Sequence, residues 1–205
     1  MLPPDIPLQK LFVLLFMMTG PLRVVPMFAA LTGDFDAQVR NRLALRGVLF
    51  ASTGILLAVF VGHVILKSWG ATPQSLAAAT GLLLLLTALQ SLVGWPSSTA
   101  NTSVSELTSD KMALSPLAFP TIVPPFAVGV IILFAAYFPD LNSQLKIVGL
   151  SFGLLLLDLV AMRFARQILQ AIGSSTLQVL GAVFGVLQLS LALQMIFWAV
   201  KPLAG

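Results

Sequence analysis

Two long apolar stretches of this chain are interrupted by prolines with the same spacing. The pattern Pro-x4-Pro occurs at Pro21/Pro26 and again at Pro120/Pro125, each time within a stretch apolar enough to cross a membrane. Proline has no amide hydrogen, so a helix carbonyl one turn earlier loses its usual partner. Unpaired carbonyls are costly in hydrocarbon, and such a segment must be buried in protein or line a polar cavity. The pattern therefore predicts two broken membrane helices, one in each half of the chain.

The composition is that of an integral membrane protein. Apolar residues make up 58% and charged residues 9% of the chain, against roughly 45–50% and about 25% in soluble domains. At about 20 apolar residues per crossing, the sequence predicts six transmembrane helices and no soluble domain. We expect these helices at residues 10–31, 43–66, 73–94, 116–138, 145–166 and 176–200.

A second similarity between the halves indicates an internal repeat. The segments 81–90 and 185–194 agree at six of ten positions, and their separation is 104 residues, against 99 for the proline pairs. One duplication with small insertions explains both values. A unit of three crossings reverses direction, so the second copy enters from the opposite side. We therefore predict an all-α polytopic membrane protein of two inverted three-helix repeats, with residues 1–95 and 116–205 joined by a polar Ser/Thr-rich linker at 96–115.

Basic residues are distributed unevenly between the two predicted sides of the membrane. One side holds Arg40, Arg42, Arg46, Lys111, Arg163 and Arg166, and the other holds Lys10, Lys67, Lys146 and Lys201. Lysine and arginine are enriched in cytoplasmic loops. The difference predicts that both termini lie outside the cytoplasm. The formal net charge of +4 is then explained by short loops beside lipid headgroups, and nucleic acid is not an expected partner.

The two breaks are the predicted substrate-binding region. Pro21 frees the carbonyl of Met17, and Pro125 frees that of Thr121. Helix N-termini at such breaks suit a carboxylate, and freed carbonyls suit an ammonium or a small cation. A packing kink is the alternative at either break taken alone. The candidate positions at the breaks are Gly20, Pro21, Pro26, Pro120, Thr121 and Pro125.

Arg23 lies between the prolines of the first break, where a buried arginine costs roughly 2.5–3.5 kcal/mol. Asp158 is the only carboxylate clearly inside a predicted span, and the two residues lie equally far into helices that enter from the same side. We expect them at the same depth. Two readings stay open: a structural ion pair between helices, or a site in which Arg23 binds a substrate carboxylate while Asp158 holds the arginine or takes part in proton coupling.

Gln90 and Gln194 occupy equivalent places in the repeat and are possible secondary site residues, although bonding between helices explains them as well. Gln188 is polar too, but it has no polar counterpart in the other half. With no cysteine and one histidine in the chain, we expect no metal site. We also expect no cofactor. No catalytic residue is expected either, since no serine–histidine arrangement is visible.

The first break resembles a known motif. The MarC family of bacterial membrane proteins, grouped with small neutral amino acid transporters, has Asn-Pro-x-Gly-x-x-Pro-x-Phe in its first span, and residues 20–28 here are similar. The family's fourth span opens with Pro-Leu-Ala-x-Pro, as at 116–120, and its last span ends near Gln-Met-Ile, as at 194–196. The resemblance covers nearly the whole chain. It implies the fold, a multi-pass location in the bacterial inner (plasma) membrane, and transport.

This chain departs from the family motifs at the breaks themselves. The family's asparagine is Gly20 here, its following glycine is Arg23, and the glycine-proline-glycine of the second break appears as residues 124–126, Pro-Pro-Phe. A bulky positive side chain thus stands where the family keeps the backbone bare. The resemblance therefore carries over the fold but not the identity of a substrate.

These observations predict a transporter or exporter of a small polar solute, such as a neutral amino acid, by alternating access at a site near the membrane midplane. The alternative is a non-transporting membrane scaffold or regulatory subunit, in which the kinks are structural. The expected partners are the lipid bilayer, the solute, and a coupling proton or cation.

Overall fold

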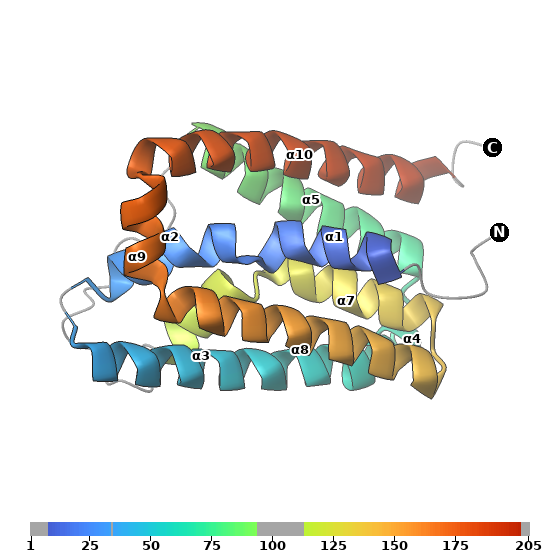
Figure 1. The fold of residues 1–205 in the computed structure, drawn as a ribbon. Coiled ribbons are helices and arrows are strands. Elements are labelled where there is room, and N and C mark those ends of the chain that lie inside the picture. The colour runs from blue at the N-terminus through green and yellow to red at the C-terminus, as the bar shows by residue number, and fades with distance from the viewer. Residues whose placement is uncertain (1–7, 34, 94–112, 202–205) are drawn as a thin grey trace.

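The computed structural model describes residues 8–33, 35–93 and 113–201, and within these ranges every regular element is a helix (Figure 1). The predicted all-α class is confirmed. The elements are α1 (Leu8–Thr19), α2 (Pro21–Leu31), α3 (Ala37–Leu57), η1 (Ala58–Gly62), α4 (His63–Ser68), α5 (Pro73–Val93), η4 (Ala113–Ile122), α7 (Pro125–Tyr137), α8 (Leu141–Arg163), α9 (Ala165–Ile172) and α10 (Ser174–Val200). The elements η1 and η4 are π-helices.

Five helical segments in the described part of the chain are long and apolar enough to cross a membrane. They are Leu11–Leu31, Ala37–Ser68, Pro73–Val93, Leu141–Arg163 and Val179–Val200, and α7 is a shorter apolar helix. These segments, together with η4 and α7, overlap the six predicted spans. Most of the predicted Ser/Thr-rich linker, including Lys111, lies outside the described residues.

The first predicted span is broken where the sequence indicated. Helix α1 ends at Thr19, Gly20 has an extended backbone with φ −70° and ψ 172°, and α2 begins at Pro21. A Cβ atom on Gly20 would lie 2.2 Å from the carbonyl oxygen of Phe16, so this turn requires glycine. Pro26 lies inside α2 and does not interrupt it.

The second break has the same local form, and it lies at the second proline of the predicted pair Pro120/Pro125, whereas the first break lies at the first proline of its pair. Pro120 lies within η4, whereas Pro124 has an extended backbone with φ −70° and ψ 154° and α7 begins at Pro125. Proline fits the first position of a helix because an amide there has no partner within the helix. Pro21 and Pro125 are thus the residues that start the new helices. These two helix starts are 104 residues apart, whereas the spacing of the two proline pairs is 99.

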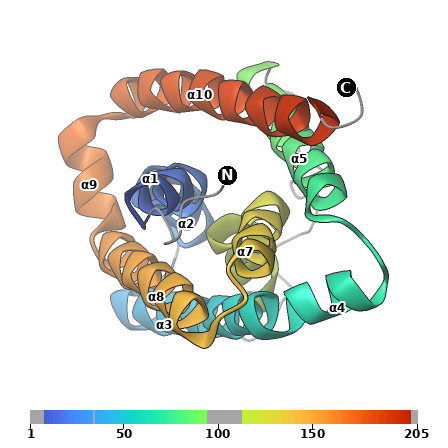
Figure 2. The same ribbon diagram turned by 90° about the vertical axis from the view of Figure 1, so that its right-hand side faces the viewer.

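The broken helices lie in the middle of the bundle. Viewed from its end, α1, α2 and α7 are surrounded by α3, α4, α5, α8, α9 and α10 (Figure 2). Helix α5 packs along α10, and α3 packs along α8. Helices α2 and α7 run in opposite directions, and the start of α1 and the end of α10 lie at the same end of the bundle (Figure 1).

Helix α9 was not predicted from the sequence. Span 145–166 was expected to continue through Arg166, but α8 ends at Arg163 and α9 lies across the end of the bundle (Figure 1). Its apolar side, at Ala165, packs inward, while its polar side chains are exposed. The guanidinium of Arg166 donates a hydrogen bond to the carbonyl of Gly33. Such a short amphipathic helix is suited to the membrane interface.

Candidate binding site at the first helix break

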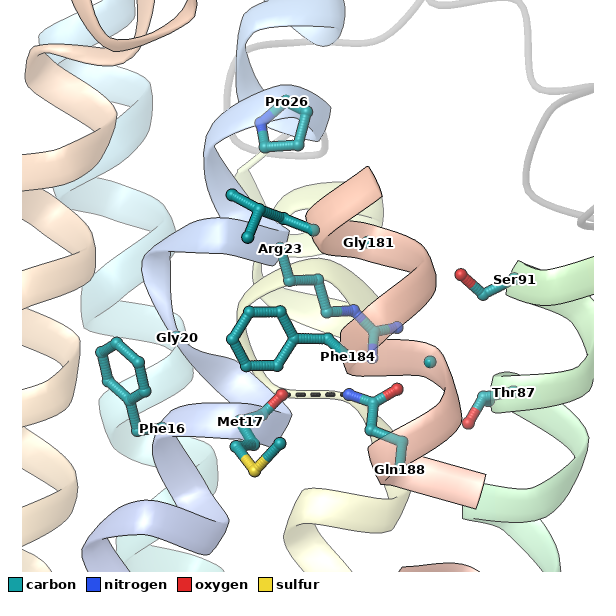
Figure 3. Close-up of a pocket in the computed structure, with 12 residues that line it drawn as sticks. Phe16, Met17, Gly20, Arg23, Pro26, Thr87, Ser91, Gly181, Phe184 and Gln188 are labelled. Carbon is teal, nitrogen blue, oxygen red and sulfur yellow. Dashed lines mark hydrogen bonds between the residues drawn. The ribbon is translucent and has the colours of Figure 1, made fainter. Parts of the chain in front are cut away.

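A cavity of about 280 Å³ opens beside the first break, between α2, α5 and α10 (Figure 3). This volume is at the lower end of small-molecule sites, which span roughly 300–1,000 Å³. The cavity therefore suits a small solute. Its lining residues are Phe16, Met17, Gly20, Arg23, Pro26, Thr87, Ser91, Leu180, Gly181, Phe184, Gly185 and Gln188.

Arg23 supplies the positive charge of this cavity. Its side chain leaves the first turn of α2 and extends toward α10 (Figure 3), and its guanidinium carbon lies 5.2 Å from the centre of the Phe126 ring. No ion pair is formed between Arg23 and any carboxylate of the described residues. The guanidinium can donate five hydrogen bonds in a planar fork that matches a carboxylate. The N-terminus of α2 adds partial positive charge at the same place, so the site favours an anionic group.

Gln188 repairs the backbone at the break. Pro21 cannot donate to the carbonyl of Met17, as the sequence predicted, and the side-chain amide of Gln188 donates to that carbonyl at 3.0 Å (Figure 3). This bond identifies the amide nitrogen, because a carbonyl can only accept. The sequence left Gln188 unexplained. The signal that could have found it is an amide near the middle of the last predicted span, together with a carbonyl that proline had freed in the first.

Hydrogen-bond acceptors lie on the other walls of the cavity. With its nitrogen bonded to Met17, the side-chain oxygen of Gln188 remains available as an acceptor. Thr87 donates its hydroxyl hydrogen to the carbonyls of Leu83 and Leu84, both at 3.0 Å, so its oxygen can also accept. The cavity thus combines a cationic donor with neutral acceptors. This combination matches a small zwitterion better than a simple anion.

A second hollow, of about 660 Å³, shares Arg23, Pro26 and Thr87 with the first cavity and extends to the second break. It brings together residues that are far apart in the sequence. Of the predicted site residues, it is lined by Arg23, Pro26, Gln90, Pro120, Thr121 and Pro125, and the first cavity by Gly20, Arg23 and Pro26. Pro21 and Gln194 line neither, and Gln194 is exposed on α10.

Asp158 is not paired with Arg23 in this structure. Its side chain is fully buried on α8, and neither carboxylate oxygen has a hydrogen-bond partner among the described residues. Two residues at equal depth in the membrane contact each other only if the helix faces that carry them are turned toward each other. Arg23 extends toward α10, whereas α8 packs against another side of α2 (Figure 2). The ion pair allowed by the sequence is therefore not formed here, and Arg23 keeps its donors for the cavity.

Known proteins match this chain along almost its whole length. The MarC family of integral membrane proteins matches residues 7–204. A UPF0056 membrane protein of Methanocaldococcus jannaschii is 27% identical over 187 residues, covering 89% of this chain and 90% of that protein. A UPF0056 membrane protein of Buchnera aphidicola is 24% identical, with 95% and 92% covered, and YhcE of Escherichia coli is 22% identical, with 94% and 91% covered. No solved structure matches the chain.

Proposed function

The chain belongs to the MarC family of integral membrane proteins, and we propose that it transports a small solute with a carboxylate group by alternating access at the first helix break. The observation that carries this proposal is Arg23, a half-buried arginine without an ion-pair partner among the described residues, in a cavity of about 280 Å³. A charge placed in a membrane-spanning segment is expensive. Binding a solute anion offsets this cost.

The polar groups on the cavity walls favour one class of solute. A carboxylate bound by Arg23 would leave an attached ammonium near the acceptor oxygens of Thr87 and Gln188. A neutral amino acid with a small side chain carries both groups and fits the volume. A cationic solute without a carboxylate is disfavoured by the charge of Arg23.

We also propose that the fold is an inverted repeat with a constant register of 104 residues. Four helices support this register, because Pro21 and Pro125 begin α2 and α7, and Asp36 and Asp140 precede α3 and α8. The first turns agree as well. The amides of Arg23 and Val24 bond to the carbonyl of Gly20, and those of Ala127 and Val128 bond to that of Pro124.

Contacts between α5 and α10 give independent support for this register. A Cβ atom on Gly81 would lie 2.9 Å from the side chain of Ile196, and one on Gly185 would lie 2.9 Å from that of Leu92. Adding 104 to the α5 residue of one contact gives the α10 residue of the other: Gly81 becomes Gly185, and Leu92 becomes Ile196. In alternating access, the two related halves would then exchange conformations, so that the site opens to one side of the membrane and then to the other.

Transport is tested by counterflow in vesicles that contain the purified protein. We expect L-alanine to exchange, and both alaninamide, which lacks the carboxylate, and propionate, which lacks the ammonium, to compete weakly. Arg23→Leu should reduce alanine exchange about tenfold or more, because hydrogen bonds to charged groups contribute roughly 1.5–3 kcal/mol. Arg163→Leu, which removes an exposed arginine from α8, is the control and should exchange normally.

Absence of exchange with any small amino acid, from a folded protein, would contradict transport and favour the scaffold. Equal exchange by Arg23→Leu and the wild type would instead remove Arg23 from the site.

The orientation remains a proposal of its own. Arg40, Arg42, Arg163 and Arg166 lie on α3, α8 and α9 at one end of the bundle, opposite the end that carries Lys67 and Lys201 (Figure 1). The arginine-rich end would face the cytoplasm of a bacterial inner membrane, with both termini outside. An alkaline phosphatase fused after Gly205 should then be active, and activity of a cytoplasmic reporter alone would reverse the assignment.

A further inference from the structure

Two buried polar side chains on α8 have no partner within the described part of the chain. They are Ser151, with 3% of its surface exposed, and Asp158, with 0%. Buried polar groups are nearly always hydrogen-bonded. The two residues are seven positions apart, so they lie on the same face of α8, about 10 Å apart along the helix.

A very small cavity lies on this face. Its volume is about 10 Å³, and its lining includes Thr19, Ser151, Leu154 and Leu155. This is about the space that one water molecule needs. The hydroxyl of Thr19 donates to the carbonyl of Leu15 at 2.9 Å, and its oxygen can accept from a water. On α8 the cavity is lined from Ser151 to Leu155, so it ends about one helical turn before Asp158.

Among the described residues, no cationic side chain is hydrogen-bonded to Asp158. The basic residues on the elements packed against α8 are Lys10 on α1, Arg23 on α2, Arg40, Arg42 and Arg46 on α3, and Arg166 on α9, with Lys146 and Arg163 on α8 itself. Arg23 lies over Phe126, and Arg166 bonds to Gly33. Neither oxygen of Asp158 accepts a hydrogen bond from any described residue. An ionised carboxylate without a partner is costly at such a site.

A proton is the cation that fits this geometry. A metal ion would need several oxygen ligands close together, and Ser151 is about 10 Å along the helix, too far to share an ion with Asp158. A proton needs only the carboxylate. Protonation forms one O–H bond on Asp158, and release breaks that bond and passes the proton to water.

We propose that Asp158 is a proton-binding site, and that a water in the cavity beside Ser151 and Thr19 is one step of the path by which its proton exchanges. Thr19 is the last residue of α1, directly before Gly20. This step of the path therefore lies beside the break between α1 and α2. This inference rests on the proposed function, because it names the ion whose movement drives the solute.

Infrared spectroscopy tests the site without any transport. In pH titrations of the purified protein in lipid, we expect a carboxylic C=O band at neutral pH, where exposed carboxyl groups are ionised. The band should be lost in Asp158→Asn and kept in Asp36→Asn, which changes an exposed residue. Ser151→Ala should slow the exchange of this proton in D2O. A wild-type spectrum without the band at neutral pH, or with a band that never titrates, overturns the proposal.

Two further measurements distinguish a proton from a sodium ion at Asp158, and the proton site from the proposed transport. If NaCl, compared with choline chloride, raises the melting temperature of the wild type but not of Asp158→Asn, the occupant is sodium and the proton assignment is wrong. In vesicles, Asp158→Asn should lose alanine accumulation driven by a pH gradient while retaining counterflow. If the wild type shows no counterflow, the proposed function fails, and the infrared titration still decides the proton site.

Discussion

The two helix breaks have nearly the same backbone and very different surroundings. In both, an extended residue precedes a proline that begins a helix, at Pro21 and at Pro125. The first helix start opens onto a cavity lined by Arg23 and Gln188. Near the second, Ala127 is fully buried and Gly129 lies against Thr80, and the hollow that reaches Pro124 and Pro125 receives its charged group, Arg23, from the first break.

The difference lies in a few side chains. In a register of 104 residues, Arg23 corresponds to Ala127, and Gln188 corresponds to Leu84, which is fully buried. Proline and an extended cap are enough to form the break. They are not enough to form a binding site, which also needs polar groups that face the open space. A broken membrane helix therefore predicts a site only when polar residues on the facing helices accompany it.

The largest expected effect on stability comes from the tight packing near the second break. A Cβ atom on Gly129 would lie 2.2 Å from the hydroxyl oxygen of Thr80, so Gly129→Leu should destabilise the protein by about 3 kcal/mol. Unfolding in detergent, followed by circular dichroism, measures this loss. The milder Gly129→Ala should be partly rescued by Thr80→Ala, which removes the nearest atoms.

Gly149 is the matched control, because no atom lies within 4 Å of a Cβ added there. Gly149→Ala should be neutral or stabilise by up to about 1 kcal/mol, since alanine favours a helix. If Gly129→Leu is as harmless as this control, the first turns of α7 are not tightly packed and the contrast between the breaks disappears.

The repaired carbonyl at the first break gives a smaller effect. Gln188→Leu leaves the carbonyl of Met17 without its donor, and the expected loss of stability is about 1–2 kcal/mol. Pro21→Ala restores a backbone N–H and should reduce the cost of Gln188→Leu in the double variant. The exposed Gln194→Leu should change stability by less than about 0.5 kcal/mol. Additive losses in the Pro21 and Gln188 cycle would show that the bond does not repair the break.

The smallest expected effect on stability comes from the N-terminal caps of the helices that follow the two broken spans. Asp140 caps α8 by accepting a hydrogen bond from the amide of Ser143 at 2.8 Å, whereas Asp36 makes no such side-chain bond before α3. The backbone N–H of Ser143 lowers the pKa of Asp140. Because the folded state has the lower pKa, the stabilisation is present above the ordinary aspartate pKa of about 3.9 and is lost as the pH falls through the folded value.

Asp140→Ala should therefore lower the melting temperature slightly at neutral pH and have less effect in strong acid. Asp36→Ala should have a smaller effect at neutral pH. Equal shifts for both variants would indicate that the two caps do not differ in solution.

Much of the fold follows from hydropathy and proline chemistry, and the site follows only in part. The apolar spans and the break at Gly20 are local consequences of composition and of a missing amide. The resemblance to the MarC family is also confirmed. At the second break the new helix begins at Pro125 and not at Pro120, because Pro120 is accommodated within the π-helix η4. Sequence spacing cannot show which of several prolines begins a new helix.

The remaining differences depend on tertiary packing. The sequence put Arg23 and Asp158 at one depth, but their helical faces diverge, and a one-dimensional pattern does not contain that angle. Helix α9 is short and partly polar, so it carries no hydropathy signal for a span. Gln188 gained a role only when α10 was placed beside the first break, where its amide reaches Met17.

The bond between Gln188 and Met17 has a consequence for the history of this sequence. Pro21 creates the need for a donor, and Gln188 supplies it from a helix more than a hundred and fifty positions away in the chain. Loss of either residue alone changes the balance of donors and acceptors at the break. Loss of both restores it, so the two positions form an epistatic pair. Among descendants of a common ancestor, we expect proline at the first and an amide at the second to be inherited together or replaced together.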